Sequence, residues 1–517
     1  MRNLLLYTAV FILLVGCNSP SSKPEELPIE QERFEQQLKA SNFKQLKLDP
    51  AQFKFLNTFY AANDYQRFWV NDSLLLPDGD TLQHLLNNYY YFCTPLNRYK
   101  ELPSFHDLDL IEQENLITLK LAYLLNDLKE GFIDTVQKQI KPLSPLSPDH
   151  LSKFIKEEKI GTWEQNILRH STPHENFTKT LEGINAFVKT YKLDTIAYKI
   201  SSAKEDSIQS KQEAKLALYT KGFTDGPEID DSIYTLALMK FQTMNGLEAD
   251  GVLGKNTVEA LNESNASKYN RTVLALDKWR WKDSLPDKYI WVNIPAYELS
   301  LYINDSLKRQ HRVVVGTRFN RTPQFTADMK TIVAYPFWHV PYSISSKEIL
   351  PHLKKDSNYL AKNNYKIFKD GSRVDASQVD WSKIGRNSFP YSVRQDGGSY
   401  NSLGLVKLLF PNEHSVYIHD TPSKKFFDKA VRSYSHGCIR CQNPLELAGY
   451  ILERDTNVYN RDSLDVLIAR RTQKTIPLNH PFPVFVDYIS VGTDSNDAIV
   501  FYLNVYNKDE EWLRLLK

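Results

Sequence analysis

The segment SVYIHDTPSKKFFDKAVRSYSHGCIRCQNPLEL, residues 415–447, decides the fold and the chemistry of the C-terminal part of the chain. Residues 415–419 alternate between polar and apolar side chains, which predicts a β-strand. With its apolar residues turned inward, this strand presents Tyr417 and His419 together on its polar face. The following Asp-Thr-Pro, residues 420–422, predicts a turn that ends the strand.

A cysteine follows a glycine further along this segment, in the run Ser435-His436-Gly437-Cys438-Ile439-Arg440. Glycine has no Cβ, so a reacting carbonyl group can approach the backbone closely. We expect the N–H groups of Gly437 and Cys438 to point at a developing oxyanion. Residues 443–446, Asn-Pro-Leu-Glu, predict a helix start with Asn as the cap. The positive end of that helix, together with Arg440, is expected to lower the thiol pKa.

A thiol nucleophile requires a base, because a free cysteine is only slightly ionised at neutral pH. We assign this role to His419, since a side chain on a strand can face the tip of the loop, and expect His436 to shape the loop. Alternatively, Cys438 is a buried structural thiol. A second alternative reads Cys438 and Cys441 as a CxxC redox or zinc motif, but no thioredoxin-like βαβ pattern precedes it and no second cysteine pair exists. Cys441 is then either an apolar filler or a disulfide partner of Cys93.

The chain around this segment, from residue 287 to about 510, is rich in β-branched and aromatic residues with partial alternation. Strand-like runs include residues 407–410, 482–486 and 498–505. Within it, KEILPHLKK and NYLAKNNY predict short helices. The sequence therefore predicts a β-rich unit.

A small separate unit is expected at residues 207–265. Its stretch LALMKFQTMNGLEADGVLGKNTVEALN predicts a helix that ends at Gly246, a turn at Asp250-Gly251, and a second helix over residues 255–261. The pattern resembles the peptidoglycan-binding-like three-helix bundle, in which these residues mostly build the fold. Binding to cell wall and a purely packing role both stay open.

Residues 31–206 are expected to form a helical scaffold, because LITLKLAYLLNDLKEGF, residues 116–132, has apolar residues at helical spacing and then Gly131 as a stop. We identify no candidate catalytic motif in this region. His106 and Asp107 have no partner at metal-ligand spacing, so we expect no metal site there, and no cofactor is expected.

The first seventeen residues, MRNLLLYTAVFILLVGC, have one early positive charge and a short apolar stretch, which is typical of a secretory signal. The ending Leu-Val-Gly-Cys resembles a bacterial lipobox, with Cys17 as the lipidated residue. Residues 18–30 are rich in Ser, Pro and Glu and suit a solvated tether. We therefore expect a protein anchored to a membrane through lipid, in the periplasm or cell envelope.

The amino-acid composition excludes further classes of protein. The chain has 517 residues, 42% of them hydrophobic and 12% aromatic, so it holds enough material for several packed cores. Lys and Arg total 64 against 62 Asp and Glu, a balance that argues against a nucleic-acid binder. Four cysteines are too few for a disulfide scaffold of this size. The predicted class is a multi-domain α+β protein.

The runs SHGCIR and IHDTP together resemble the signature of the L,D-transpeptidase (YkuD-type) family. The segments VNIPAYELSLY, TPQF, NSLGLVKLLFPN and NPLELA make the chain similar to the large periplasmic members, in which a helical scaffold and a peptidoglycan-binding-like unit precede the catalytic domain. The resemblance is specific over residues 402–448 and weak in the scaffold.

This resemblance implies that Cys438 is the nucleophile and His419 the general acid and base. It places the family's loop residues on Ser435, His436, Gly437 and Arg440, and Tyr417 becomes an oxyanion or substrate donor by position. It also implies an insertion that caps the active site, at about residues 338–401.

The implied reaction uses peptidoglycan stem peptides as donor and acceptor: a Cys thioester forms with release of D-Ala, and an amine then makes a 3→3 cross-link. Carbapenem-type inhibitors are expected by the same resemblance. An L,D-carboxypeptidase and a non-catalytic wall-binding lipoprotein stay open as alternatives. The group that orients His419 is either Asp420 or a backbone carbonyl. Four cations are candidates for stem carboxylates, although each is also explained as a surface charge: Arg318, Arg394, Lys407 and Arg432.

Overall fold

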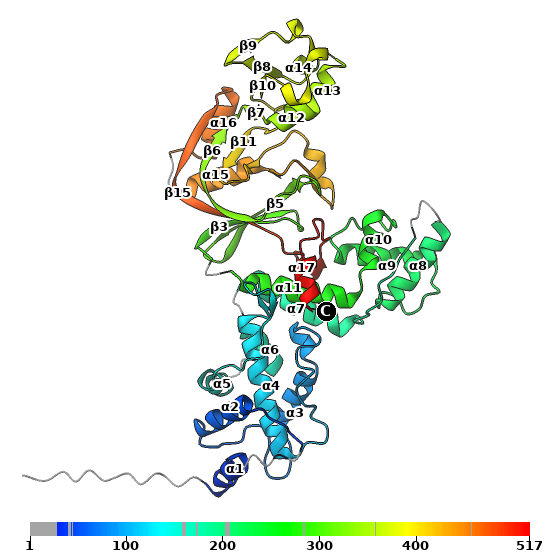
Figure 1. Ribbon diagram of the computed structural model, residues 1–517, viewed down its shortest axis with the longest axis vertical. Helices are drawn as coiled ribbons and strands as arrows, with labels where there is room; N and C mark the ends of the chain where they lie inside the picture. The colour runs from blue at the N-terminus through cyan, green and yellow to red at the C-terminus, as the bar shows by residue number, and fades with distance from the viewer. Residues whose placement is uncertain are drawn as a thin grey trace, which may run out of the picture. The chain divides into compact units, whose positions relative to one another are not determined.

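The computed structural model describes residues 28–39, 43, 45–157, 162–171, 174–201, 207–282, 285–356, 358–455 and 458–516. The signal, Cys17 and almost all of the tether predicted from the sequence lie outside these residues. No helix in the described ranges is long and apolar enough to cross a membrane. The chain divides into two compact units, of which the first comprises residues 1–83, 103–122 and 146–158 and the second the remainder. Figure 1 shows the order of the elements along the chain.

The first unit is helical, as the sequence predicts. Its elements are α1 (Ile29–Lys39), α2 (Pro50–Ala61), most of α3 (Pro77–Asn87), the first part of α4 (Leu110–Glu130) and α5 (Pro148–Lys156). The buried carboxylate of Glu114 on α4 accepts the backbone N–H groups of Phe68 and Trp69 at 2.8 Å each. Burial nevertheless raises the pKa of Glu114 to about 7.

The helices of the second unit include the end of α4, which stops at Gly131 with φ +74° as predicted. Its other elements before the large sheet are η1 (Tyr89–Phe92), β1 (Ile133–Asp134), β2 (Gln139–Ile140), α6 (Trp163–Arg169), α7 (Glu175–Thr190), α8 (Ser207–Thr220), α9 (Asp231–Met244), α10 (Lys255–Asn262) and α11 (Asn265–Arg280).

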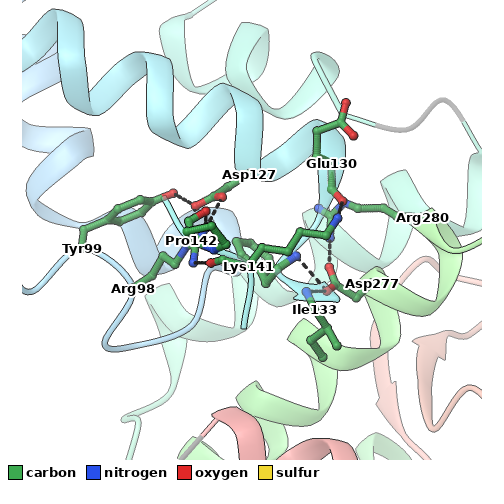
Figure 2. A network of polar contacts seen from close by, with 10 residues as sticks. Arg98, Tyr99, Asp127, Glu130, Ile133, Lys141, Pro142, Asp277 and Arg280 are labelled. Carbon is green, nitrogen blue, oxygen red and sulfur yellow. Dashed lines mark hydrogen bonds and ion pairs between the residues drawn. The ribbon is translucent and has the colours of Figure 1, made fainter. Parts of the chain in front are cut away.

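A buried polar network joins α11 to the segment after α4 (Figure 2). The Asp277 carboxylate accepts the N–H groups of Phe132 and Ile133 at 2.8 Å each and pairs with Arg280 at 2.7 Å. The adjoining part of the network holds Arg98, Tyr99 and Asp127. Because both carboxylates accept several hydrogen bonds, the charges are compensated inside the protein.

Helices α8, α9 and α10 form the predicted small bundle, with a core that includes Leu218, Leu238 and Phe241. Gln242 organises its loop: its amide donates to Asp250 Oδ1 at 2.9 Å and accepts the Gly251 N–H at 2.9 Å. The motif residues therefore hold the turn in place, as the sequence analysis expects.

The β-rich part is a nine-stranded sheet in the order β13-β5-β14-β12-β11-β6-β15-β3-β4. An additional pairing of β4 with β5 closes the sheet on itself, as in a barrel. Its strands are β3 (Lys288–Asn293), β4 (Glu298–Ile303), β5 (Ser306–Gly316), β6 (Phe325–Ala334), β11 (Val406–Leu409), β12 (Ile418–His419), β13 (Ser433–Ser435), β14 (Ile439–Cys441) and β15 (Lys474–Asp487).

Helix α15 (Pro444–Arg454) fills the core of this sheet with Leu447 and Ile451, and α16 (Arg461–Ala469) packs beside it. The chain ends in a hairpin of β16 (Val491–Thr493) and β17 (Ile499–Phe501), followed by α17 (Glu510–Leu513) and η7 (Arg514–Leu516).

The predicted insertion between β6 and β11 has a sheet of its own, in the order β7-β10-β8-β9. Its apolar core is separate from that of the nine-stranded sheet and includes Leu350, Ile367 and Trp381. Its elements are β7 (Trp338–Val340), α12 (Tyr342–Ile344), η2 (Ser345–Ile349), α13 (Leu350–Leu353), α14 (Tyr359–Lys362), β8 (Tyr365–Lys369), β9 (Ser372–Val374), η3 (Ala376–Gln378), η4 (Trp381–Lys383), η5 (Arg386–Ser388) and β10 (Ser392–Gln395). Outside the insertion, η6 (Lys424–Asp428) follows β12. The predicted multi-domain α+β class is confirmed.

Candidate active site

The loop that carries Cys438 is a tight turn between β13 and β14. Gly437 has φ +118°, a conformation that side-chain-bearing residues rarely adopt. The Ser435 hydroxyl donates to the Cys438 carbonyl at 2.6 Å and accepts the Gly437 N–H at 3.1 Å. The Ser435 hydroxyl therefore stabilises the turn through these two hydrogen bonds rather than facing a substrate.

Thr322 supports the same turn from a distant part of the sequence. Its hydroxyl donates to the Gly437 carbonyl at 2.8 Å and accepts the Gly316 N–H at 2.9 Å. The sequence analysis did not assign a role to Thr322. The only signal was its place in the TPQF segment, which the family resemblance already contained.

The expectation that the Gly437 N–H points at an oxyanion is wrong, because that N–H is taken by Ser435. Of the loop hydrogen bonds between described residues, none uses the Cys438 N–H. This leaves the Cys438 N–H as a donor for an oxyanion.

The Cys438 thiol is half-buried, and its Sγ lies 3.8 Å from the Ser415 carbonyl oxygen. Burial raises the thiol pKa, although hydrogen bonding from Tyr417 and the charges of Arg440 and Lys407 act in the opposite direction. The predicted lowering of the thiol pKa is therefore wrong in sign, because desolvation is the larger effect.

Two local expectations about neighbouring backbone also need correction. Helix α15 begins at Pro444 as predicted, but Asn443 adopts a left-handed conformation and its side chain makes no cap hydrogen bond. The strand before His419 is shorter than predicted: β12 contains only Ile418 and His419, and Ser415 has φ +56°. Its faces are nevertheless as expected, since Ile418 lies in the core and the Tyr417 and His419 rings are 5.6 Å apart.

The His419 imidazole is buried and held in one orientation. Its Nδ1 lies 2.5 Å from the Asp420 carbonyl oxygen. A carbonyl only accepts, so Nδ1 carries the proton and Nε2 keeps its lone pair. Burial and the Arg440 charge lower the His419 pKa to about 4, which keeps the ring neutral at pH 7.

Of the two groups considered for orienting His419, the backbone carbonyl is the one present. The Asp420 carboxylate is occupied elsewhere, since it accepts the Leu405 N–H at 2.9 Å and pairs with Lys424.

Strand pairing brings the nucleophile loop beside His419. Strands β12 and β14 are parallel, with Ile418 opposite Ile439 and His419 opposite Arg440. Tyr417 links the two candidate catalytic residues, because it interacts with the Cys438 thiol and its ring lies next to His419.

The insertion reaches this site at two points. The His436 Nε2 lies 2.8 Å from a carboxylate oxygen of Glu348 on η2, and Tyr417 interacts with Trp338 on β7. His436 thus joins the loop to the insertion. Sequence reasoning missed Glu348, which has no local motif and lies 88 residues from its partner.

The four candidate cations have different surroundings. Arg432 is buried and donates to backbone carbonyls of Val313, Lys429 and Tyr297, so it is neither a surface charge nor free for a substrate. Arg318 is exposed and lies near Val505 and Asn507.

Arg394 contacts Asp396 at 3.4 Å, and its guanidinium lies over the Phe337 and Phe368 rings. Lys407 is half-buried over the Tyr417 ring, with Nζ 5.7 Å from its centroid.

In the described part of the chain, no group of three or more His, Cys, Asp or Glu side chains is placed to hold a metal ion. Cys93 and Cys441 are both buried free thiols, so the alternative of a disulfide between them is not realised. Cys441 belongs to the apolar core of the sheet.

Three stretches of the chain match known protein families. Residues 287–459 match YkuD, the L,D-transpeptidase catalytic domain. Residues 210–261 match the family described as "Putative peptidoglycan binding domain", and residues 54–177 match a family described as "Scaffold domain".

A Haemophilus influenzae protein named "Putative L,D-transpeptidase" is 33% identical over 230 residues, which are 44% of this chain and 46% of that protein. The chain thus spans about half the length of this relative. The resemblance drawn from the sequence is confirmed at the level of the family.

Two solved structures overlap with 39% of the chain. They are an L,D-transpeptidase from Mycobacterium smegmatis, with 11% identity, 58% of its chain covered and a TM-score of 0.18, and the Ldtfm–avibactam carbamoyl enzyme, with 12% identity, 49% covered and a TM-score of 0.17.

Proposed function

Because the chain carries the catalytic domain of the L,D-transpeptidase family, we propose that it transfers acyl groups between peptidoglycan stem peptides through a thioester on Cys438. The donor is a tetrapeptide stem, the leaving group is its terminal D-Ala, and the product is a 3→3 cross-link. The orientation of His419 supports this most directly. With Nδ1 bound to the Asp420 carbonyl, Nε2 is the free acceptor that a general base requires.

In the first step, the Cys438 sulfur attacks the carbonyl of the third stem residue while the thiol proton passes to His419 Nε2. The Cys438 N–H stabilises the oxyanion. The C–N bond then breaks, and the proton moves from His419 to the departing D-Ala amine. Both groups begin neutral, since the thiol pKa is raised and the imidazole pKa is lowered.

In the second step, the side-chain amine of an acceptor stem attacks the thioester. His419 takes the amine proton and returns it to sulfur as the C–S bond breaks. Covalent catalysis divides one difficult acyl transfer into two easier ones. Water in place of the amine gives the L,D-carboxypeptidase reaction.

Intact-mass analysis of the protein with a carbapenem tests the acyl-enzyme. We expect one adduct in the wild type and none in Cys438→Ser. An unmodified wild-type protein would argue for the wall-binding alternative. Incubation with disaccharide tetrapeptide then separates the two reactions, because a transpeptidase yields a cross-linked dimer and a carboxypeptidase yields only the tripeptide.

The same proposal places the protein at the cell wall. The match of residues 210–261 to a peptidoglycan-binding family supports an envelope location and a wall contact by the α8–α10 bundle. Cys17 is proposed to carry the lipid that holds the protein at a membrane. Labelled palmitate that is incorporated by the wild type and not by Cys17→Ala supports the anchor, and incorporation that survives the substitution contradicts it.

A further inference from the structure

A row of three side chains crosses the sheet at the candidate site. His419 on β12 is opposite Lys407 on β11 and opposite Arg440 on β14. Directly paired residues point to the same face of a sheet. The core residues beside them, which include Leu408 and Ile439, occupy the other face. The His419 imidazole is therefore flanked by two cations.

Neither cation has a counter-charge. Both are half-buried, and within the described residues neither the Lys407 ammonium nor the Arg440 guanidinium makes a hydrogen bond or ion pair with a side chain of this chain. They contact aromatic rings instead, Lys407 that of Tyr417 and Arg440 that of Phe426, with its Cζ 6.0 Å from the centroid.

Acidic groups near the row are already engaged. The Asp420 carboxylate binds Lys424 and the Leu405 N–H. The Glu348 carboxylate accepts from His436. Two unpaired, partly desolvated cations are unfavourable unless an anion neutralises them. The row is thus built for an anion that comes from outside the chain.

The position of the row indicates which anion. Lys407 and Arg440 both interact electrostatically with the Cys438 thiol. An anion bound by them must therefore lie close to the substrate carbonyl that the Cys438 sulfur attacks. Neighbouring strands lie about 4.8 Å apart, so the backbones of the two cations are roughly 10 Å apart across His419. In a tetrapeptide donor, the terminal carboxylate lies only one residue beyond the scissile carbonyl.

We propose that Lys407, together with Arg440, binds the free C-terminal carboxylate of the acyl donor and so restricts the enzyme to stems that end one residue after the scissile bond. This inference rests on the proposed function, because it needs an acyl donor at Cys438. A longer stem would place an uncharged peptide bond between the two cations and leave them unpaired.

The test compares two synthetic tetrapeptides with a diamino acid at the third position, one ending in D-Ala and the other in D-alaninamide. Release of the terminal residue is measured by mass spectrometry, with kcat and KM for each peptide. In the wild type we expect kcat/KM to fall about tenfold with the amide, which corresponds to about 1.4 kcal/mol. In Lys407→Met the ratio of kcat/KM for the acid to that for the amide should fall from about ten to about one, beyond any equal slowing of both peptides that follows from the lost charge near the Cys438 thiol.

Two further variants separate binding from folding. Lys407→Arg keeps the charge and should retain most of the preference for the acid. Lys308→Met removes an exposed lysine outside the row, which donates to the Ser306 hydroxyl at 2.9 Å, and should behave as the wild type. Thermal unfolding of each variant checks that the fold is intact.

The inference is overturned if folded Lys407→Met keeps the preference for the acid, if it slows both peptides equally, or if the wild type does not discriminate. Absence of release from both peptides in the wild type would instead refute the proposed function, and this inference with it.

Discussion

The reactivity of Cys438 should rise steadily with pH across the neutral range. Burial raises the pKa of the Cys438 thiol, so only a small fraction of the sulfur is thiolate at pH 7. The His419 pKa is about 4, so His419 is almost entirely neutral above pH 6 and does not form an ion pair with a thiolate there. The rate of alkylation should therefore rise with pH through the neutral range, by up to about tenfold for each pH unit from 6 to 8.

Alkylation by iodoacetamide, followed by intact mass at a series of pH values, measures this profile. The measurement uses a Cys17→Ser background, in which one modification is expected, because Cys93 and Cys441 are fully buried. Cys438→Ser is the matched control and should remain unmodified. Lys407→Met should shift the profile to higher pH, since the Lys407 charge lowers the thiol pKa. A rate that is constant from pH 6 to 8 would show a preformed thiolate–imidazolium pair and refute the reasoning.

Three substitutions test other features. His419→Ala should slow acylation by a carbapenem by about 10²–10⁴-fold without unfolding the protein, and an unchanged acylation rate would exclude His419 as the base. Gly404→Ala should destabilise the protein by at least about 2 kcal/mol in urea unfolding, because φ is +58° and a Cβ would lie 2.3 Å from the Asp420 side chain; normal stability would contradict that close approach. Asp277→Ala should cost about 3–5 kcal/mol in the same assay, since it leaves the Arg280 charge buried without its partner, and a loss below about 1 kcal/mol would show that water or a shifted side chain replaces the carboxylate.

Features fixed by local pattern could be predicted from the sequence. The alternation before His419 predicted which side chains share a face, and Gly131 marked the end of α4. The Asp250-Gly251 pair predicted a turn, which the structure holds through hydrogen bonds to Gln242.

Features that depend on distant parts of the chain could not be predicted in this way. Thr322 reaches Gly437 across 115 residues of sequence, and Glu348 reaches His436 across 88. The sign of the thiol pKa shift was wrong for the same reason. The sequence displays the charge of Arg440, but the degree of burial around Cys438 arises only when Tyr417 and the loop pack together.

The location of Cys441 in the apolar core has a consequence for oxidative damage. Among the described residues, the other thiols, Cys93 and Cys441, are buried and free, so neither is available as a resolving partner for Cys438. A sulfenic acid formed on Cys438 therefore has no thiol in the described part of the chain with which to condense, and further oxidant carries it toward irreversible acids. A small thiol or a reducing protein that reaches the half-buried sulfur would protect the nucleophile from this oxidation.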